Sequence, residues 1–293
     1  MKKNISIILG SLLFAFAAGE AYATNTATDY NTTYAVTRTD TAKLSLDRVI
    51  EIHEKLLLDK TIEEAPSVTI DINIPVVKSL NKDISKKLDR TLTSMIFEEE
   101  ESSLDKAVQV FCRNRKEEFV LYINELINDD GDNISDFSGF FYNFFYGITA
   151  DVKSGLNGYI NYTVTQEVYE GGAHPNSYKS TIIFNPIDGN TVTLDDILKP
   201  GYKEALTALL TTKLLEEYNA KTIKEAQEIG LFINETGVPI PSNYTFDNNG
   251  IVFIYNTYEI APYVFGAIHL TLTYDELKDL LKKWKAYSNI SQI

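Results

Sequence analysis

Glu170 and His174 are the residues whose types and spacing come nearest to a catalytic pair. They flank Gly171-Gly172-Ala173 in the run 169–176, Tyr-Glu-Gly-Gly-Ala-His-Pro-Asn. Two glycines allow a positive backbone φ or the close approach of another segment. A Glu and a His four residues apart around such a loop suit a general base and the group that orients it. The alternative is structural: the glycines make a tight connection, and His174 bonds to backbone carbonyls. We favour the structural interpretation, because no nucleophile, metal cluster or second carboxylate pair is tied to this loop.

A second concentration of polar and aromatic residues spans 255–266, Tyr-Asn-Thr-Tyr-Glu-Ile-Ala-Pro-Tyr-Val-Phe-Gly. Aromatic side chains beside a proline and a glycine can form a rigid contact surface for a protein partner. They can also pack beneath a loop. If the two segments form one binding surface, its anchors are Tyr169, Tyr258 and Tyr263. The full set of predicted binding residues is Tyr169, Gly171, Gly172, His174, Asn176, Tyr258, Glu259, Pro262 and Tyr263.

The sequence predicts neither a metal site nor a cofactor. His53 lies in a charged stretch and is expected on the surface, and His269 is expected on the polar face of an alternating strand. Neither has a second His or Cys at metal-ligand spacing. The acidic residues at 98–101 and 129–132 lack the spacing of a calcium loop. The sequence also has no Gly-rich phosphate loop, nucleophile elbow or zincin helix.

The charge of the chain excludes two classes of partner. Its 293 residues include 41 acidic and 27 basic side chains, giving a formal net charge of −14 and a pI near 4.7. Nucleic acid binding needs clustered Lys and Arg, and docking on an anionic membrane needs positive charge as well. A basic protein partner suits this chain. The single cysteine, Cys112, rules out an internal disulfide and is expected to be a small buried hydrophobe.

Residues 1–23 have the three parts of an export signal. Two lysines precede a predominantly apolar stretch at 5–18, and Ala21-Tyr22-Ala23 is a small-x-small cleavage site. The apolar stretch is shorter than the ~20 residues that span a bilayer, so cleavage after Ala23 is favoured over a retained anchor. No cysteine lies near that site for a lipoprotein anchor, and no later stretch is long and apolar enough to cross a membrane. We therefore expect a periplasmic or secreted protein, with the net charge changing from −14 to −15 on loss of Lys2, Lys3 and Glu20.

The rest of the chain mixes strand-like and helix-like segments. After a tail at 24–43, apolar spacing predicts a helix at 44–58, a strand at 68–76, an amphipathic helix at 80–96 and a second helix from Ser102. Strands are predicted at 140–151, 156–170, 178–184 and 268–272, helices at 202–218, 222–232 and 273–284, and a hairpin at 244–255. This order predicts an α+β fold of two subdomains, 44–156 and 157–293, in which antiparallel or mixed sheets pack with amphipathic helices.

Two motifs resemble a bacterial family of exported domains of unknown function. The first runs from Tyr169-x-Gly-Gly-Ala-His174 through Phe184-Asn185 and Asp188-Gly189 to Thr191-x-Thr-Leu-Asp-Asp-Ile-Leu198. The second is Asn249-Gly-Ile-x-Phe-x-Tyr-x-x-Tyr-Glu-Ile-Ala-Pro-Tyr263, followed by Gly266. The family forms the C-terminal half of the ectodomain of RsiV, an anti-sigma factor that senses lysozyme, and the resemblance covers residues 157–285. The preceding region looks like the domain that accompanies this half in RsiV and in the peptidoglycan deacetylase PdaC.

The resemblance implies an α+β fold in two subdomains and a binding role. RsiV has a sigma-binding segment and a membrane helix where this chain has an export signal, and no deacetylase domain like that of PdaC is present. Pro175 also stands where the family more often has Gly. The resemblance thus implies an exported, non-enzymatic module that binds lysozyme, another basic envelope protein or a peptidoglycan fragment. The alternative is an envelope hydrolase that uses Glu170 and His174, with Asp195 or Asp196 as its second carboxylate.

Overall fold

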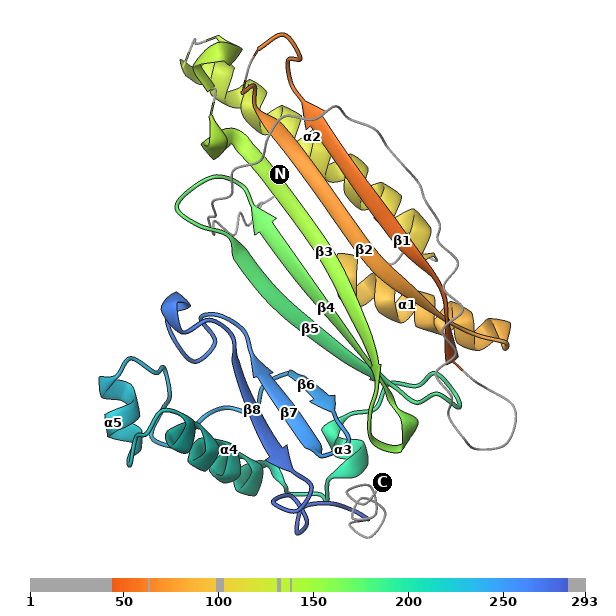
Figure 1. Cartoon of the computed structure of the whole chain (residues 1–293), viewed down its shortest axis with the longest axis vertical. Coiled ribbons are helices and arrows are strands. Elements are labelled where there is room, and N and C mark those ends of the chain that lie inside the picture. Colours follow the sequence, from red (N-terminus) through yellow and green to blue (C-terminus); the bar gives the residue numbers. More distant parts are fainter. Residues whose placement is uncertain (1–43, 63, 99–102, 131–132, 138, 284–293) are drawn as a thin grey trace, which may run out of the picture.

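Two β-sheets form the frame of the molecule (Figure 1). The computed structural model describes residues 44–62, 64–98, 103–130, 133–137 and 139–283, so the predicted export signal and tail lie outside the described residues. The larger sheet has the strand order β1 (Leu44–Leu57), β2 (Ser67–Ser79), β3 (Asn143–Ser154), β4 (Ile160–Tyr169) and β5 (Asn176–Phe184). β2 and β3 are parallel, and the other neighbours are antiparallel. The smaller, antiparallel sheet consists of β6 (Asn243–Phe246), β7 (Gly250–Tyr255) and β8 (Ile268–Thr273). The predicted α+β class with mixed and antiparallel sheets is confirmed.

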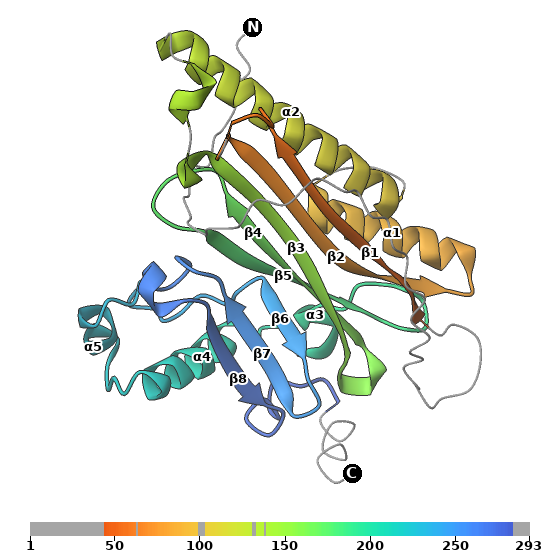
Figure 2. The same cartoon turned by 45° about the horizontal axis from the view of Figure 1, so that its top comes forward.

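Two helices, α1 (Lys82–Phe97) and α2 (Leu104–Asp130), cover one face of the five-stranded sheet, and Figure 2 shows both behind it. They meet the inward side of β2, whose alternating Val68, Ile70, Ile72, Ile74 and Val76 are at most 2% exposed. The predicted strand and the two predicted helices are therefore confirmed, although the predicted start at Ser102 lies outside the described residues. No helix in the described ranges is both long and apolar enough to cross a bilayer. We call the five-stranded sheet with α1 and α2 the first lobe.

The start of α1 differs from the prediction. Leu80 was expected on its buried side but is 91% exposed. The helix begins only after Asn81, whose side chain accepts hydrogen bonds from the backbone N–H groups of Asp83 and Ile84. This cap satisfies N–H groups that have no partner within the helix, and it leaves Leu80 in the turn outside.

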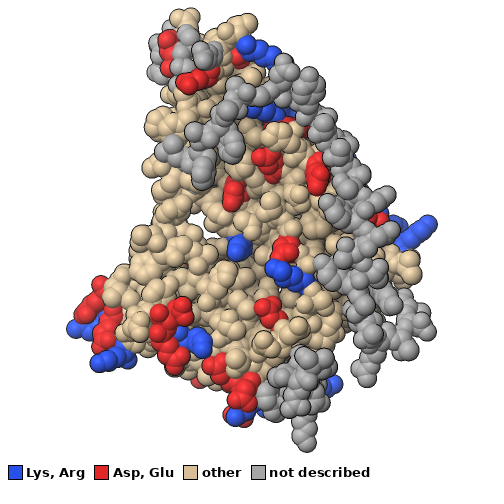
Figure 3. All heavy atoms as spheres, viewed as in Figure 1, with Lys and Arg blue, Asp and Glu red and all other residues tan. Residues whose placement is uncertain are grey.

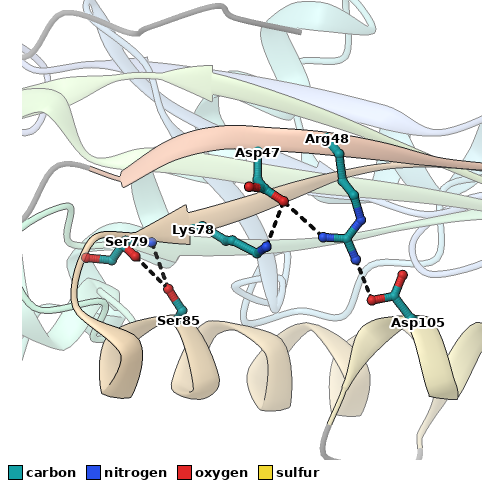
Figure 4. A network of polar contacts seen from close by, with 6 residues as sticks. All are labelled: Asp47, Arg48, Lys78, Ser79, Ser85 and Asp105. Atoms are coloured by element: carbon teal, nitrogen blue, oxygen red, sulfur yellow. Dashed lines mark hydrogen bonds and ion pairs between the residues drawn. The ribbon is translucent and has the colours of Figure 1, made fainter. Parts of the chain in front are cut away.

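The helix predicted at 44–58 is wrong, because this segment is the edge strand β1. Every second residue of its second half, including Ile50, Ile52 and Leu56, packs toward the core under the helices. Two inward positions carry charges instead: Lys116 of α2 donates to Glu54 over 2.7 Å, and Arg48 bonds to Asp105 (Figure 4). A bulge between Leu46 and Arg48 shifts the register as well. The alternation of apolar residues along β1 is therefore interrupted, and the sequence pattern did not indicate a strand. The charged residues at its inward positions are paired with residues of α2.

The second lobe is the three-stranded sheet with α3 (Leu194–Ile197), α4 (Lys203–Glu217) and α5 (Ile223–Glu228), which share one apolar core. Short 3-10 turns lie at Ile134–Phe137, Phe140–Tyr142, Leu156–Gly158 and Tyr263–Phe265. The closing helix predicted from Thr273 is wrong, because the residues after β8 form successive turns. The predicted capping residues do bond, with Glu276 accepting from the Thr273 N–H over 2.7 Å. However, Leu281 pairs with Leu198 in a β-bridge, and this extended pairing is incompatible with a helix at Leu281. Trp284 lies outside the described residues.

Asparagine side chains join the two lobes. The buried Asn161 of β4 donates to the carbonyl of Phe246 over 3.1 Å and accepts from its N–H over 2.9 Å. Asn243 accepts from the N–H of Thr181 on β5 over 3.0 Å. Asn161 thus makes both of the backbone bonds that a neighbouring strand would make, and Asn243 makes one. β4 and β5 follow the predicted boundary at residues 156–157 in sequence, yet they belong to the first sheet. The division into two domains at this boundary stays a prediction.

Candidate functional site

The structure brings together the two segments singled out from the sequence. The ring of His174, in the loop between β4 and β5, stacks on the ring of Tyr263 with centroids 4.1 Å apart and planes 21° from parallel. Tyr258 completes the cluster, with its hydroxyl 3.5 Å from Nε2 of His174. Tyr258 and Tyr263 are 52% and 39% exposed. We call His174, Tyr258 and Tyr263, with the neighbouring Val264, the tyrosine–histidine surface.

Backbone geometry explains how the first segment reaches this position. Gly171 and Gly172 have φ of 86° and 106°, in the region that favours glycine. A Cβ on Gly171 would also lie 3.0 Å from the carbonyl oxygen of Phe141. The sequence-based expectation that both glycines shape a tight connection agrees with these angles. Asn176 then begins β5, opposite Val168 of β4.

The second segment is fixed to the first lobe by Asn256. Its side chain accepts from the N–H of Lys179 over 2.6 Å and donates to the carbonyl of Lys179 over 2.9 Å. It also donates to the carboxylate of Glu259 over 3.2 Å. Two residues later, Tyr258 has a φ of 71°, which costs a non-glycine residue energy. Pro262 then begins the short turn that carries Tyr263. The exposed tyrosines therefore stand on an anchored, strained loop.

Tyr169 does not belong to the exposed surface. It is only 3% exposed, and its ring stacks on Phe140 at a centroid distance of 6.2 Å. Its hydroxyl donates to the carbonyl of Gly172 over 3.4 Å, and burial raises the pKa of this hydroxyl, which keeps the donor proton in place. The predicted anchor is thus a support under the glycine loop, because the β4 register turns its side chain beneath that loop.

Glu170 and His174 do not form the pair that a hydrolase would need. Glu170 accepts a hydrogen bond from the hydroxyl of Tyr146 over 2.6 Å, and burial followed by the charge of Glu170 raises the pKa of Tyr146. Nδ1 of His174 donates to the carbonyl of Pro175 over 3.0 Å, so Nε2 is the ring nitrogen that faces the hydroxyl of Tyr258. Asp196, a suggested second carboxylate, accepts from the N–H and hydroxyl of Thr193 as a helix cap. These contacts are those of the structural interpretation.

Two exposed apolar residues that the sequence did not point to lie beside the second segment. Phe232 is 54% exposed, and its N–H donates to the carbonyl of Ile260 over 2.7 Å. Ile229 is 47% exposed and precedes Gly230, where an added Cβ would lie 3.9 Å from Pro262. Both were assigned to a helix at 222–232, but α5 ends at Glu228. The glycine in the run Ile-Gly-Leu-Phe at 229–232 was the sequence feature that could have indicated the end of the helix before these residues.

The remaining candidate residues do not gather into a metal site. Within the described ranges, no group of three or more His, Cys, Asp and Glu side chains is placed to hold a metal ion. His53 is exposed on β1 and contacts Asp71, whereas His269 is exposed on β8. Burial, the largest effect, raises the pKa of Cys112 to about 12, so this buried thiol stays protonated. The prediction of a buried Cys112 is confirmed.

Comparison with known proteins finds a family without an assigned activity. Residues 195–275 match DUF3298, described as a protein of unknown function. The DUF3298 match includes Tyr258 and Tyr263, whereas His174 precedes it. No curated protein matches the chain.

Two solved DUF3298 structures resemble the fold. BF2082 from Bacteroides fragilis NCTC 9343 is 24% identical, with a TM-score of 0.72 over 87% of this chain and 100% of that chain. PA4972 from Pseudomonas aeruginosa PAO1 is 19% identical, with a TM-score of 0.51 over 84% of this chain and 96% of that chain. At these identities the likeness shows a shared fold.

Proposed function

We propose that this chain is an exported binding module of the bacterial cell envelope, located in the periplasm or outside the cell. Its partner is a basic envelope-associated protein such as lysozyme, which docks on the tyrosine–histidine surface. The observation that carries the proposal is the stack of His174 on Tyr263, with Tyr258 beside it. Glu170 and His174 bond to Tyr146 and to the carbonyl of Pro175, which favours binding over hydrolysis.

The tyrosine–histidine surface has the features of a protein-binding hot spot. Exposed tyrosines offer large apolar areas with few rotatable bonds, so ordering them on binding costs little entropy. Val264 is 86% exposed, and Phe232 extends the apolar area. The negative charge of the chain would speed the approach of a basic partner, while the aromatic contacts would slow its dissociation.

Calorimetric titration of residues 24–293 with lysozyme at two salt concentrations tests the proposal. We expect saturable one-to-one binding that weakens as salt rises, because charge steers the approach. Absence of both heat and inhibition of lysozyme would overturn lysozyme as the partner, and peptidoglycan fragments would then be the next ligands to titrate.

Replacing the tyrosines tests the surface itself. Tyr258→Ala and Tyr263→Ala should each weaken lysozyme binding by about 1 kcal/mol or more if both are hot spots. Tyr178→Ala is the matched control, because Tyr178 is a 42% exposed tyrosine on β5 outside both segments. Unchanged affinity in both loop variants, with circular dichroism showing an intact fold, would remove the assignment.

A further inference from the structure

The five-stranded sheet has a second face that the helices leave uncovered. α1 and α2 pack on one side only, and the second lobe covers the opposite side near β5, where Ile183 joins its core. The part of this side formed by β1, β2, β3 and β4 is hollowed, with a volume of about 570 Å³. Figure 3 looks onto this side and shows carboxylates, together with Lys or Arg side chains, scattered among uncharged residues. We call the hollowed part the open sheet face.

The centre of the open sheet face is a row of three residues on adjacent strands. Asp71 of β2 lies opposite Gly147 of β3, which lies opposite Glu167 of β4. The ring of Phe145 leans across Gly147, since a Cβ there would lie 2.9 Å from its Cε1 atom and 3.0 Å from its Cζ atom. Neighbouring strands are about 4.8 Å apart, so the two acidic residues stand roughly 10 Å apart with an aromatic ring between them.

Apart from His53, the charged side chains that line the hollow are acidic. Its lining includes the carboxylates of Glu51, Asp71 and Glu167 and no Lys or Arg. Asp71 contacts His53, whereas neither Glu51 nor Glu167 has an ion pair among the described residues. Lys55 and Lys179 point to the same side of the sheet by register, but they lie outside the lining.

We propose that the open sheet face docks a basic peptide segment of a partner protein, with an Arg or Lys side chain over Phe145 between Asp71 and Glu167. A guanidinium or ammonium group gains from an aromatic face and from flanking carboxylates together. The hydroxyl groups of Thr149 and Thr165, which also line the hollow, can bond to the peptide backbone. This surface is separate from the tyrosine–histidine surface, so the inference does not depend on the function proposed above.

The test is titration of residues 24–293 with hexa-arginine, acetylated and amidated at its ends, in low salt. The test variant carries Glu51→Gln, Asp71→Asn and Glu167→Gln. The control carries Glu204→Gln, Glu235→Gln and Asp279→Asn, three exposed carboxylates of the second lobe. Both variants gain three charge units, so general attraction changes equally. We expect binding about tenfold weaker in the test variant and less than about twofold weaker in the control.

Two further variants test the aromatic ring and the location of the binding surface. Phe145→Leu should weaken hexa-arginine binding about threefold, because it removes the aromatic face and keeps an apolar side chain. Tyr258→Ala with Tyr263→Ala should leave hexa-arginine binding unchanged, whatever it does to lysozyme binding. Equal weakening in the test and control triple variants would overturn the proposal by showing that net charge alone attracts the peptide. Peptidoglycan oligosaccharide binding that requires Phe145, with hexa-arginine binding unaffected by the triple variant, would overturn it in favour of a saccharide.

Discussion

The tyrosine–histidine surface and the open sheet face differ in how their side chains are held. Tyr258 and Tyr263 stand on a loop that depends on Asn256, a positive φ and a stacked imidazole. Asp71 and Glu167 stand on neighbouring strands of one hydrogen-bonded sheet. A loop surface can therefore be lost by removing one anchor, whereas a sheet surface changes only when its own side chains change.

The largest expected effect comes from a substitution at the junction between the two lobes. Gly155→Ala would place a Cβ 1.7 Å from the carbonyl oxygen of Phe246 and 2.5 Å from Nδ2 of Asn161. Because a backbone carbonyl must move, we expect a loss of about 3 kcal/mol or more in the free energy of unfolding, measured by urea denaturation. Gly201→Ala is the control: nothing lies within 4 Å of its Cβ, so only its φ of 82° opposes the change, at about 1 kcal/mol. Similar losses in both variants would show that the junction is not tightly packed.

Removing the loop anchor should separate the two surfaces functionally. Asn256→Ala leaves the N–H and carbonyl of Lys179 without their partner, and we expect a loss of about 1–2 kcal/mol in stability. Lysozyme binding should fall with it, because the tyrosine loop loses its attachment to β5. Hexa-arginine binding should stay at the wild-type level. A parallel fall in both binding reactions would mean that the two surfaces are not held independently.

The smallest expected effect is the pH dependence of stability that comes from Glu276 in the second lobe and Asp47 in the first. Partial burial, the largest effect, raises the pKa of Glu276, but bonds from Thr273 and the charge of Lys213 bring it below its ordinary value of 4.5. At Asp47, burial likewise raises the pKa, but the bonds and charges of Lys78 and Arg48 lower it to below its ordinary value of 3.8. A lowered folded-state pKa gives stability that is present above the ordinary pKa and is lost as pH falls through the lowered one.

Urea denaturation between pH 6 and pH 3 measures these contributions. Glu276→Gln should flatten the loss of stability below about pH 4.5, and Asp47→Asn should flatten it below about pH 3.8. Each effect should be less than about 1 kcal/mol, because the side chains are 38% and 35% exposed and water screens the charges. Profiles of both variants that follow the wild type would contradict the assignment.

The sequence predicted elements whose periodicity is uninterrupted and missed those that depend on distant partners. Val68 to Val76 alternate without a break, so β2 was predictable. β1 was not, because Arg48 and Glu54 occupy inward positions that only α2 makes tolerable. The glycines marked the His174 loop, but its meeting with Tyr263 requires the bond from Asn256 to Lys179, 77 residues away. Burial of Tyr169 likewise depends on Phe140, which no local pattern connects to it.

The parallel pairing of β2 with β3 also bears on the order in which this protein folds. β3, β4 and β5 are joined by short connections, so their antiparallel pairing closes small loops at little entropic cost. β2 can reach β3 only after the intervening segment, which contains α1 and α2, has folded back. We expect the three-stranded meander to form early and the β1–β2 hairpin to dock late, with closure of the five-stranded sheet as the slow step. The row Asp71, Gly147 and Glu167 would then be completed only at the end of folding, since its first member arrives with β2.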